Sequence, residues 1–221
     1  LERAALLSLP LARKGDALVA PGGEAVLLPV ALGASSVPGS LDTANAPYVI
    51  EMLTAATDGC LSGTFSGLVT APVQKSTLIE AGNDFVGHTE FLAQRAGVDT
   101  PVMMLATDEL RVALVTIHLP LSEVPRAVTR ETLEAVLRVV DSDLRTRFGI
   151  PAPVIGVCGL NPHAGEAGHL GREEQDIIVP VIDELRAEGL VLRGPLPADT
   201  AFTKQHLKVL DVVVAMFHDQ G

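Results

Sequence analysis

One stretch limits what this chain can fold into more than any other. Residues 157–174 read VCGLNPHAGEAGHLGREE, and the apolar run at residues 154–159 leads into them. The stretch contains four glycines and two histidines, His163 and His169, and it ends in the charged start of a helical pattern. Glycines let a backbone bend and approach a ligand closely, and loops held between rigid elements commonly bind ligands. We therefore predict a buried strand, a ligand-binding loop and a helix, in that order.

Strand-like and helix-like patterns alternate along most of the chain. Predicted strands lie at residues 17–19, 25–30, 68–71, 102–106, 111–116, 154–159 and 210–217. Predicted helices lie at residues 1–9, 43–57, 74–81, 129–148 and 172–188, and another begins at Gly87-His88-Thr89. In the longest helix, one face is apolar: Leu133, Val136, Leu137, Val140 and Leu144. This alternation predicts an α/β fold around a parallel or mixed sheet.

Composition narrows the class of protein. The 221 residues are 48% hydrophobic and 19% charged, as in a globular domain, and the net charge is −11. A nucleic-acid-binding surface needs a basic stripe, so this charge argues against one. No apolar run has the length of a membrane span. The two cysteines, Cys60 and Cys158, are interpreted as buried reduced thiols of a cytoplasmic protein.

We treat residues 1–221 as one α/β chain, and the sequence does not assign a boundary between lobes. The chain begins at Leu1 and ends at Gly221, directly after a candidate site residue. We therefore expect that N-terminal and C-terminal parts are lacking.

Three histidines occupy matching places after predicted strands. His118 follows the strand at 111–116, His163 follows the strand at 154–159, and His218 follows the strand at 210–217. Ligands bind beyond the carboxyl ends of the strands in an open α/β sheet. If the three strands run parallel, the imidazoles can converge on one edge and bind a divalent transition metal. The alternative is three unrelated histidines in polar loops.

Other residues are candidates with an ordinary structural alternative. Asp199 lies in a stiff Pro-rich loop and could orient a histidine or a substrate group, or it could cap the helix that follows. His88 and Thr89 precede a helix and could hold a phosphate, although Thr89 could be a simple N-cap. Lys75, beyond the strand at 68–71, could neutralise an anion or move a proton, or it could be a solvated helix lysine.

Six segments, in order along nearly the whole chain, resemble one family. They are GHTEF (87–91), MMLATDELRVAL (103–114), HLPL (118–121), CGLNPHAGEAGHLGREE (158–174), GPLPADT (194–200) and AMFHDQG (215–221). Together they are similar to the 4-hydroxythreonine-4-phosphate dehydrogenases of vitamin B6 biosynthesis. Two positions depart from the family pattern: Phe217 stands where a tyrosine is usual, and Ala167 stands in place of a glycine.

The resemblance implies a three-layer α/β/α fold like those of isocitrate and isopropylmalate dehydrogenases, with two lobes and a cleft. It implies a homodimer that uses NAD or NADP and one divalent metal ion, such as zinc, magnesium or cobalt. It also implies oxidation and decarboxylation of 4-phosphooxy-L-threonine to 3-amino-2-oxopropyl phosphate, in the synthesis of pyridoxal phosphate. The metal ligands map onto His118, His163 and His218, one of them supplied by the partner subunit.

The family's substrate-binding pair maps onto His88 and Thr89, and its loop aspartate onto Asp199; Asp199 and Lys75 are the candidates for proton transfer. No residue is assigned to the nicotinamide cofactor. Three alternatives remain: a related enzyme that oxidises D-threonate or D-erythronate 4-phosphate, a metal-dependent phosphatase that needs no nicotinamide, and a truncated binding module without activity.

Overall fold

The computed structural model describes residues 27–221. The chain divides into two compact units, and the boundary falls between Pro101 and Val102. The helix predicted at residues 1–9 and the strand predicted at residues 17–19 lie outside the described residues.

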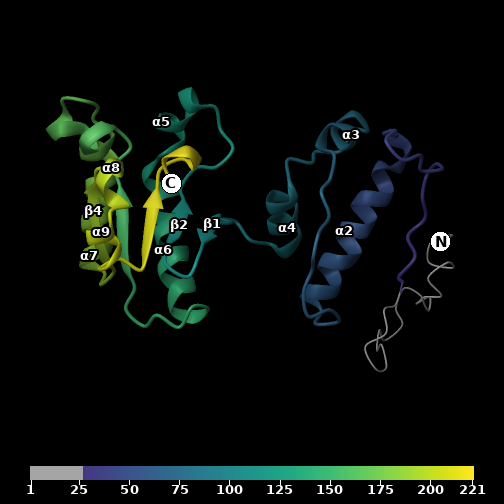
Figure 1. Cartoon of the computed structure of the whole chain (residues 1–221), viewed down its shortest axis with the longest axis horizontal. Coiled ribbons are helices and arrows are strands. Elements are labelled where there is room, and N and C mark those ends of the chain that lie inside the picture. Colours follow the sequence, from purple (N-terminus) through teal and green to yellow (C-terminus); the bar gives the residue numbers. More distant parts are fainter. Residues whose placement is uncertain (1–26) are drawn as a thin grey trace. The chain divides into compact units, whose positions relative to one another are not determined.

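The unit that begins at Val102 is built on a five-stranded sheet (Figure 1). Its strands are β1 (Met104–Ala106), β2 (Arg111–Leu114), β3 (Val154–Cys158), β4 (Val191–Leu196) and β5 (Val212–Ala215). Their order across the sheet is β1-β2-β5-β3-β4. Strand β1 is antiparallel to β2, whereas β2, β5, β3 and β4 are mutually parallel. The prediction of an α/β fold with a mixed sheet is confirmed.

Helix α6 (Arg130–Thr146) covers one face of this sheet together with α7 (Val179–Ala187). Thr129 caps α6, because its Oγ1 accepts a hydrogen bond from the backbone N–H of Thr132 at 3.2 Å. All five residues of the predicted apolar face of α6 are buried. They pack against strand residues such as Ile155 and Val214 in one core. The 3.6-residue periodicity of the sequence therefore identified this core face correctly.

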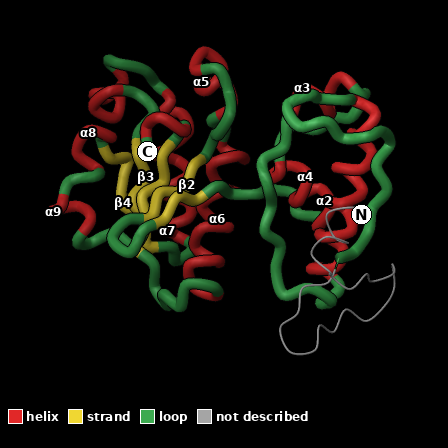
Figure 2. Tube along the Cα trace, turned by 45° about the vertical axis from the view of Figure 1, so that its right-hand side comes forward, coloured by secondary structure: helices red, strands yellow, loops and turns green. Residues whose placement is uncertain are grey.

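The opposite face of the sheet is covered by shorter elements. Helices α8 (Ala198–Ala201) and α9 (Lys204–Leu207) pack over Cys158 and Val213. Figure 2 shows the strands between α6 on one side and α8 and α9 on the other. This unit therefore has the three-layer α/β/α arrangement that the resemblance implied.

Short helical segments connect these elements. They are η3 (Leu121–Glu123), α5 (Val124–Ala127), η4 (Pro162–Gly168), the π-helical turn η5 (Glu174–Ile178) and η6 (His218–Gln220). The helix predicted at residues 172–188 thus begins as a π-helical turn and continues as α7. Strand β4 was missed by sequence analysis because Gly194 and Pro195 interrupt its apolar pattern.

The unit that ends at Pro101 is helical in its described part. Its elements are η2 (Thr43–Asn45), α2 (Ala46–Leu61), α3 (Lys75–Glu80) and α4 (His88–Ala96). A small core joins them through Ala46, Leu53, Leu78 and Phe85.

The strand predicted at residues 68–71 is wrong. Residues 67–74 form no strand, and the side chain of Val69 is 96% exposed. A strand exists only where a neighbouring strand accepts its backbone hydrogen bonds. Within residues 27–221, no strand pairs with this segment. The apolar, β-branched sequence of residues 68–71 was therefore not sufficient to form a strand.

Among the described residues, no helix is both long enough and apolar enough to span a lipid bilayer.

Leu137 offers a test of the α6–sheet core, since its side chain is 0% exposed. We expect Leu137→Ala to lower the free energy of unfolding by about 2–5 kcal/mol, because the substitution leaves a cavity that the neighbours fill only in part. The matched change Leu121→Ala removes a side chain that is 68% exposed and should change it by less than about 0.5 kcal/mol. Urea denaturation of both variants measures the difference; equal effects would contradict this core.

Candidate metal and substrate site

The three candidate ligands follow three adjacent parallel strands. Strand β5 pairs with β2 on one side and with β3 on the other, all in the same direction. In Figure 1 the arrow of β5, in yellow, points toward the end of the sheet where the C-terminus is marked. His118, His218 and His163 therefore leave the sheet at the same edge, where ligands bind in open α/β folds.

Two of these histidines lie together. The ring centroids of His118 and His218 are 6.0 Å apart, with an angle of 33° between the planes. This is roughly the spacing of two imidazoles that share one metal ion at about 2.1 Å from each ligating nitrogen. The Nδ1 atom of His218 is 2.8 Å from Oδ1 of Asp219. Because a carboxylate accepts hydrogen bonds, it holds the proton on Nδ1 and leaves Nε2 available as a ligand.

His163 does not join this pair within one chain. It is exposed in the loop after β3, and the described residues contain no group of three or more His, Cys, Asp or Glu side chains close enough to hold a metal ion. The expectation that all three imidazoles converge within a single chain is therefore wrong for residues 27–221. The pair His118 and His218 supplies two nitrogen donors, which suits a transition metal that takes further ligands from elsewhere.

The loop that carries His163 has an unusual backbone. Five consecutive residues, His163–Ala167, adopt left-handed conformations, with φ angles of 52°, 51°, 79°, 42° and 54°. Only Gly165 among them adopts this region without steric cost, because an L-residue there costs roughly 1–2 kcal/mol. Strain of this kind persists where surrounding contacts fix the backbone, and it is common at ligand sites.

A buried carboxylate, that of Glu174, forms hydrogen bonds with the first residues of this loop. Glu174 is 3% exposed, and its Oε1 accepts hydrogen bonds from the backbone N–H groups of Leu160 and Asn161, both at 2.7 Å. Its Oε2 accepts from the side-chain amide of Asn161 at 2.9 Å. The same Asn161 amide also donates a hydrogen bond to the Glu173 carboxylate at 2.7 Å. Hydrogen bonds to the Glu173 carboxylate hold its pKa below the usual value.

Two further hydrogen bonds join the ends of the three strands. Thr116, two residues before His118, donates from Oγ1 to the carbonyl oxygen of Met216 at 2.7 Å. Gln220, two residues after His218, donates from Nε2 to the carbonyl oxygen of Gly159 at 2.7 Å. Sequence analysis did not single out Glu174 or Gln220. The only indication of their role in the sequence was that Glu174 ends the segment at 158–174 and Gln220 lies in the segment at 215–221, both of which resemble the family.

Asp199 lies in the first turn of α8 and is exposed. The N-cap of α8 is Pro197, so the capping role considered for Asp199 is wrong: the helix begins two residues earlier than that role requires. Helix α8 contacts both β3 and the η4 turn, which places Asp199 on an element that packs against the His163 loop.

His88, Thr89 and Lys75 lie in the other unit, where the fold brings them together. His88 and Thr89 are the first two residues of α4, and Gly87 is its N-cap, so Thr89 is not the cap. A Cβ atom added to Gly87 would lie 2.7 Å from Oε2 of Glu90 and 3.5 Å from Nζ of Lys75. The exposed Lys75 ammonium group and the Glu90 carboxylate therefore both lie beside the start of α4, whose free N–H groups favour an anion.

One atom in this group lacks a partner. The Nε2 atom of His88 is buried, and within residues 27–221 it makes no hydrogen bond. Its ring packs edge-on against Phe85, with centroids 5.8 Å apart. A buried polar atom without a partner costs free energy, so a ligand that hydrogen-bonds this nitrogen would relieve that cost.

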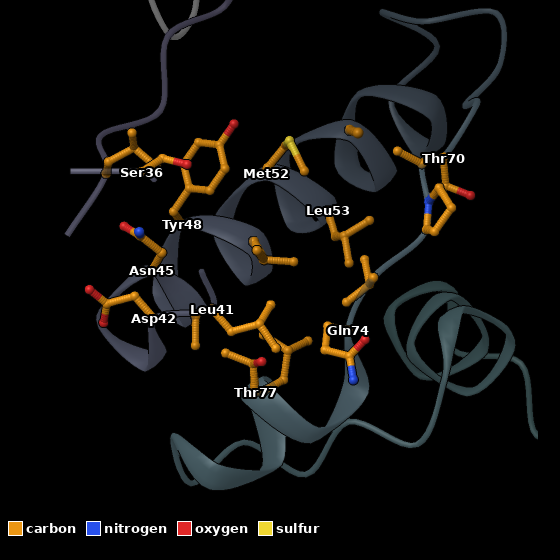
Figure 3. Close-up of a pocket in the computed structure, with 18 of the residues that line it drawn as sticks. Ser36, Leu41, Asp42, Asn45, Tyr48, Met52, Leu53, Thr70, Gln74 and Thr77 are labelled. Atoms are coloured by element: carbon orange, nitrogen blue, oxygen red, sulfur yellow. The ribbon is translucent and has the colours of Figure 1, made fainter. Parts of the chain in front are cut away.

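The same unit also contains a cavity of about 680 Å³ (Figure 3). Tyr48, Met52 and Leu53 of α2 line it on one side, and Thr70 and Gln74 line it on another. None of the predicted site residues is part of its lining, so it is separate from the candidate anion site.

The two thiols differ in environment. Cys158 is buried at the end of β3, and burial raises the pKa of its thiol to about 12. Cys60 is half-buried on α2, so the interpretation of both thiols as buried holds only for Cys158. Both are free.

Comparison with known proteins gives one consistent family. The family model "Pyridoxal phosphate biosynthetic protein PdxA" matches residues 7–221. The chain is 54% identical over its full length to a 4-hydroxythreonine-4-phosphate dehydrogenase of Serratia proteamaculans, and 56% identical to one of Thioalkalivibrio sulfidiphilus. It spans 68% of the length of each of these relatives.

A solved structure gives the same result. The crystal structure of 4-hydroxythreonine-4-phosphate dehydrogenase from Klebsiella pneumoniae superposes with a TM-score of 0.83 at 34% identity. The match covers 96% of this chain and 65% of that one.

The left-handed turn allows a test of backbone strain. We expect Ala167→Gly to raise the free energy of unfolding by about 1 kcal/mol, because glycine adopts a φ of 54° without the steric cost of a Cβ atom. The control Ala135→Gly, within the right-handed helix α6, should lower it by about 1 kcal/mol. Thermal unfolding of both variants gives the comparison, and a loss of stability in Ala167→Gly would contradict the left-handed conformation.

The thiols should differ in reactivity. With a pKa of about 12, Cys158 is a thiolate in only about 10⁻⁴ of the molecules at pH 8. The thiolate is the reactive form of cysteine. We expect a maleimide to modify Cys60 in the folded chain and to modify Cys158 only after denaturation. Mass spectrometry of peptides before and after urea treatment measures this, and prompt labelling of native Cys158 would refute its burial.

Proposed function

Because this chain belongs to the PdxA family of pyridoxal phosphate biosynthetic proteins, we propose that it acts as a 4-hydroxythreonine-4-phosphate dehydrogenase. The proposed reaction oxidises 4-phosphooxy-L-threonine with NAD or NADP and releases CO₂ and 3-amino-2-oxopropyl phosphate. The observation that supports it most is the arrangement of three histidine-bearing loops at the carboxyl edge of β2, β5 and β3.

A divalent metal ion fits this edge in its donor chemistry. His118 and His218 would hold the ion within one chain, supported by the paired rings and by Asp219 behind His218. His163 of a second copy would supply the third nitrogen, in a homodimer with the site at the subunit interface. When bound, such an ion polarises a substrate hydroxyl and stabilises negative charge on oxygen.

His88 and Thr89 are the residues proposed to bind the phosphate of the substrate. The N-terminus of α4 offers free backbone N–H groups, the Thr89 hydroxyl and the Nε2 atom of His88, which has no partner among the described residues. The nearby Lys75 ammonium adds positive charge. Binding at this distant group would fix the position of the carbon that reacts.

The proton balance of the reaction assigns roles to the remaining candidates. Oxidation removes a hydride from the substrate's hydroxyl-bearing carbon, which NAD or NADP would accept when bound, and the hydroxyl proton passes to a base. The resulting β-keto acid then breaks its bond to the carboxylate, and CO₂ leaves. A proton is finally returned to the carbon that lost CO₂. Asp199 and Lys75 are the residues proposed to receive and return these protons.

The test separates this function from its rivals. Purified chain is incubated with a divalent metal, oxidised nicotinamide and 4-phosphooxy-L-threonine, and absorbance at the reduced-nicotinamide band is followed. Parallel reactions contain D-threonate or D-erythronate 4-phosphate, or omit nicotinamide and measure released inorganic phosphate. Faster turnover of a sugar-acid phosphate, or phosphate release without nicotinamide, would reject the proposed substrate or the proposed chemistry.

The histidine assignment has a matched control in the same loop. We expect His163→Ala to abolish metal binding and to lower turnover by at least about 100-fold, because one of three nitrogen ligands is lost. His169→Ala removes an exposed imidazole six residues away and should leave both nearly unchanged. Elemental analysis and the nicotinamide assay measure the two effects. Normal metal content and turnover in His163→Ala would refute this ligand.

A further inference from the structure

A continuous set of hydrogen bonds links the loops that carry the three histidines. Thr116 joins the end of β2 to the end of β5 through the Met216 carbonyl. Gln220 joins the end of β5 to the end of β3 through the Gly159 carbonyl. Glu174 then fixes the first residues of the loop after β3. None of these three side chains has a part in the proposed chemistry.

Gln220 uses both ends of its amide to hold two loops at once. Its Oε1 accepts a hydrogen bond from the backbone N–H of Met216 at 2.7 Å, which closes the turn around His218. Its Nε2 donates to the carbonyl oxygen of Gly159 at 2.7 Å, which lies four residues before His163. The position of the His218 turn is thereby coupled to the start of the His163 loop.

Glu174 performs the corresponding task within the His163 loop. Its carboxylate accepts three hydrogen bonds, from Leu160 and from the backbone and side chain of Asn161. The adjacent glycines make room for it, because a Cβ atom on Gly165 would lie 2.5 Å from Oε2 and one on Gly159 would lie 3.0 Å from Oε1. A strained left-handed turn is thus built directly against a buried acceptor.

We propose that Gln220 and Glu174 are positioning residues: Gln220 holds the turn that carries His218, and Glu174 holds the loop that carries His163, which in the proposed homodimer are the loops that one chain contributes to the two metal sites. The inference rests on the proposed function, in which these histidines are ligands. Side chains that orient the metal ligands without binding the metal themselves commonly matter for affinity: removing them weakens metal binding about 10–100-fold. A side chain with a purely structural role would instead lower stability and leave the affinity of the folded protein unchanged.

Two substitutions at Gln220 separate the bonds. Gln220→Met keeps the length of the side chain and removes both hydrogen bonds. Gln220→Glu keeps the acceptor for Met216 and replaces the donor to Gly159 by an oxygen that repels the carbonyl, so it breaks the link between loops. Its added negative charge would by itself favour a cation, so a loss of affinity comes from the altered contact with Gly159. Gln205→Met, at an exposed position of α9, is the matched control.

Substitutions at Glu174 test the second member. Glu174→Ala removes all the acceptors, whereas Glu174→Gln retains an oxygen that can accept from the Leu160 and Asn161 N–H groups. We expect the glutamine variant to recover most of the affinity that the alanine variant loses.

The probe is Co²⁺ alone, added to the full chain at a temperature well below the unfolding midpoint of each variant. Its affinity and its visible absorption spectrum report the ligand geometry. We expect Gln220→Met, Gln220→Glu and Glu174→Ala to bind Co²⁺ at least tenfold more weakly than the parent, with altered spectra, and Gln205→Met to be unchanged. Without metal, amide hydrogen exchange across residues 160–171 should be faster in the same three variants.

The outcomes distinguish this inference from the proposed function. Parent-like Co²⁺ binding and exchange in both Gln220 variants, together with lost binding in His218→Ala, would overturn the positioning role and leave the metal site standing. Co²⁺ binding that survives His218→Ala would overturn the metal site, and the positioning role with it.

Discussion

The parallel pairing of β2, β5 and β3 is the constraint on which the rest of the site depends. Hydrogen bonds between these strands continue past their ends, from the Val115 N–H to the Ala215 carbonyl and from the Thr116 N–H to the Met216 carbonyl. Because parallel neighbours share an edge, residues far apart in sequence leave the sheet at one place. His118 and His218, one hundred residues apart, come within 6.0 Å for this reason.

Hydrogen bonds of polar side chains then fix the positions of the loops at this edge more closely than the strand pairing does. A polar group inside a protein lowers stability unless its hydrogen bonds are satisfied, so each bond at the edge restricts where the backbone can lie. The contacts of Thr116, Gln220 and Glu174 fall within a few residues of the histidines. The same contacts hold a turn of left-handed residues that would otherwise relax.

The proposed reaction draws on both units of the chain. The anion-binding candidates Lys75, His88 and Thr89 belong to the unit that ends at Pro101, and the histidine edge belongs to the unit that begins at Val102. Two observations point to ligands. Within residues 27–221 the buried Nε2 atom of His88 makes no hydrogen bond, and the rings of His118 and His218 lie together.

The α/β class, the core face of α6, the strands that precede the three histidines and the family were all predictable from the sequence, because periodicity and short motifs are local properties of the chain. The sequence did not reveal β4, whose Gly194 and Pro195 hide the pattern, and it placed a strand at residues 68–71 where none forms. The packed structure was needed to show that within residues 27–221 His118 and His218 pair while His163 stands apart. It was also needed to show that Lys75 lies beside the start of α4 and that Glu174 and Gln220 connect the loops. Those facts depend on strand order and on side-chain direction, which arise when distant segments pack together and which no local pattern contains.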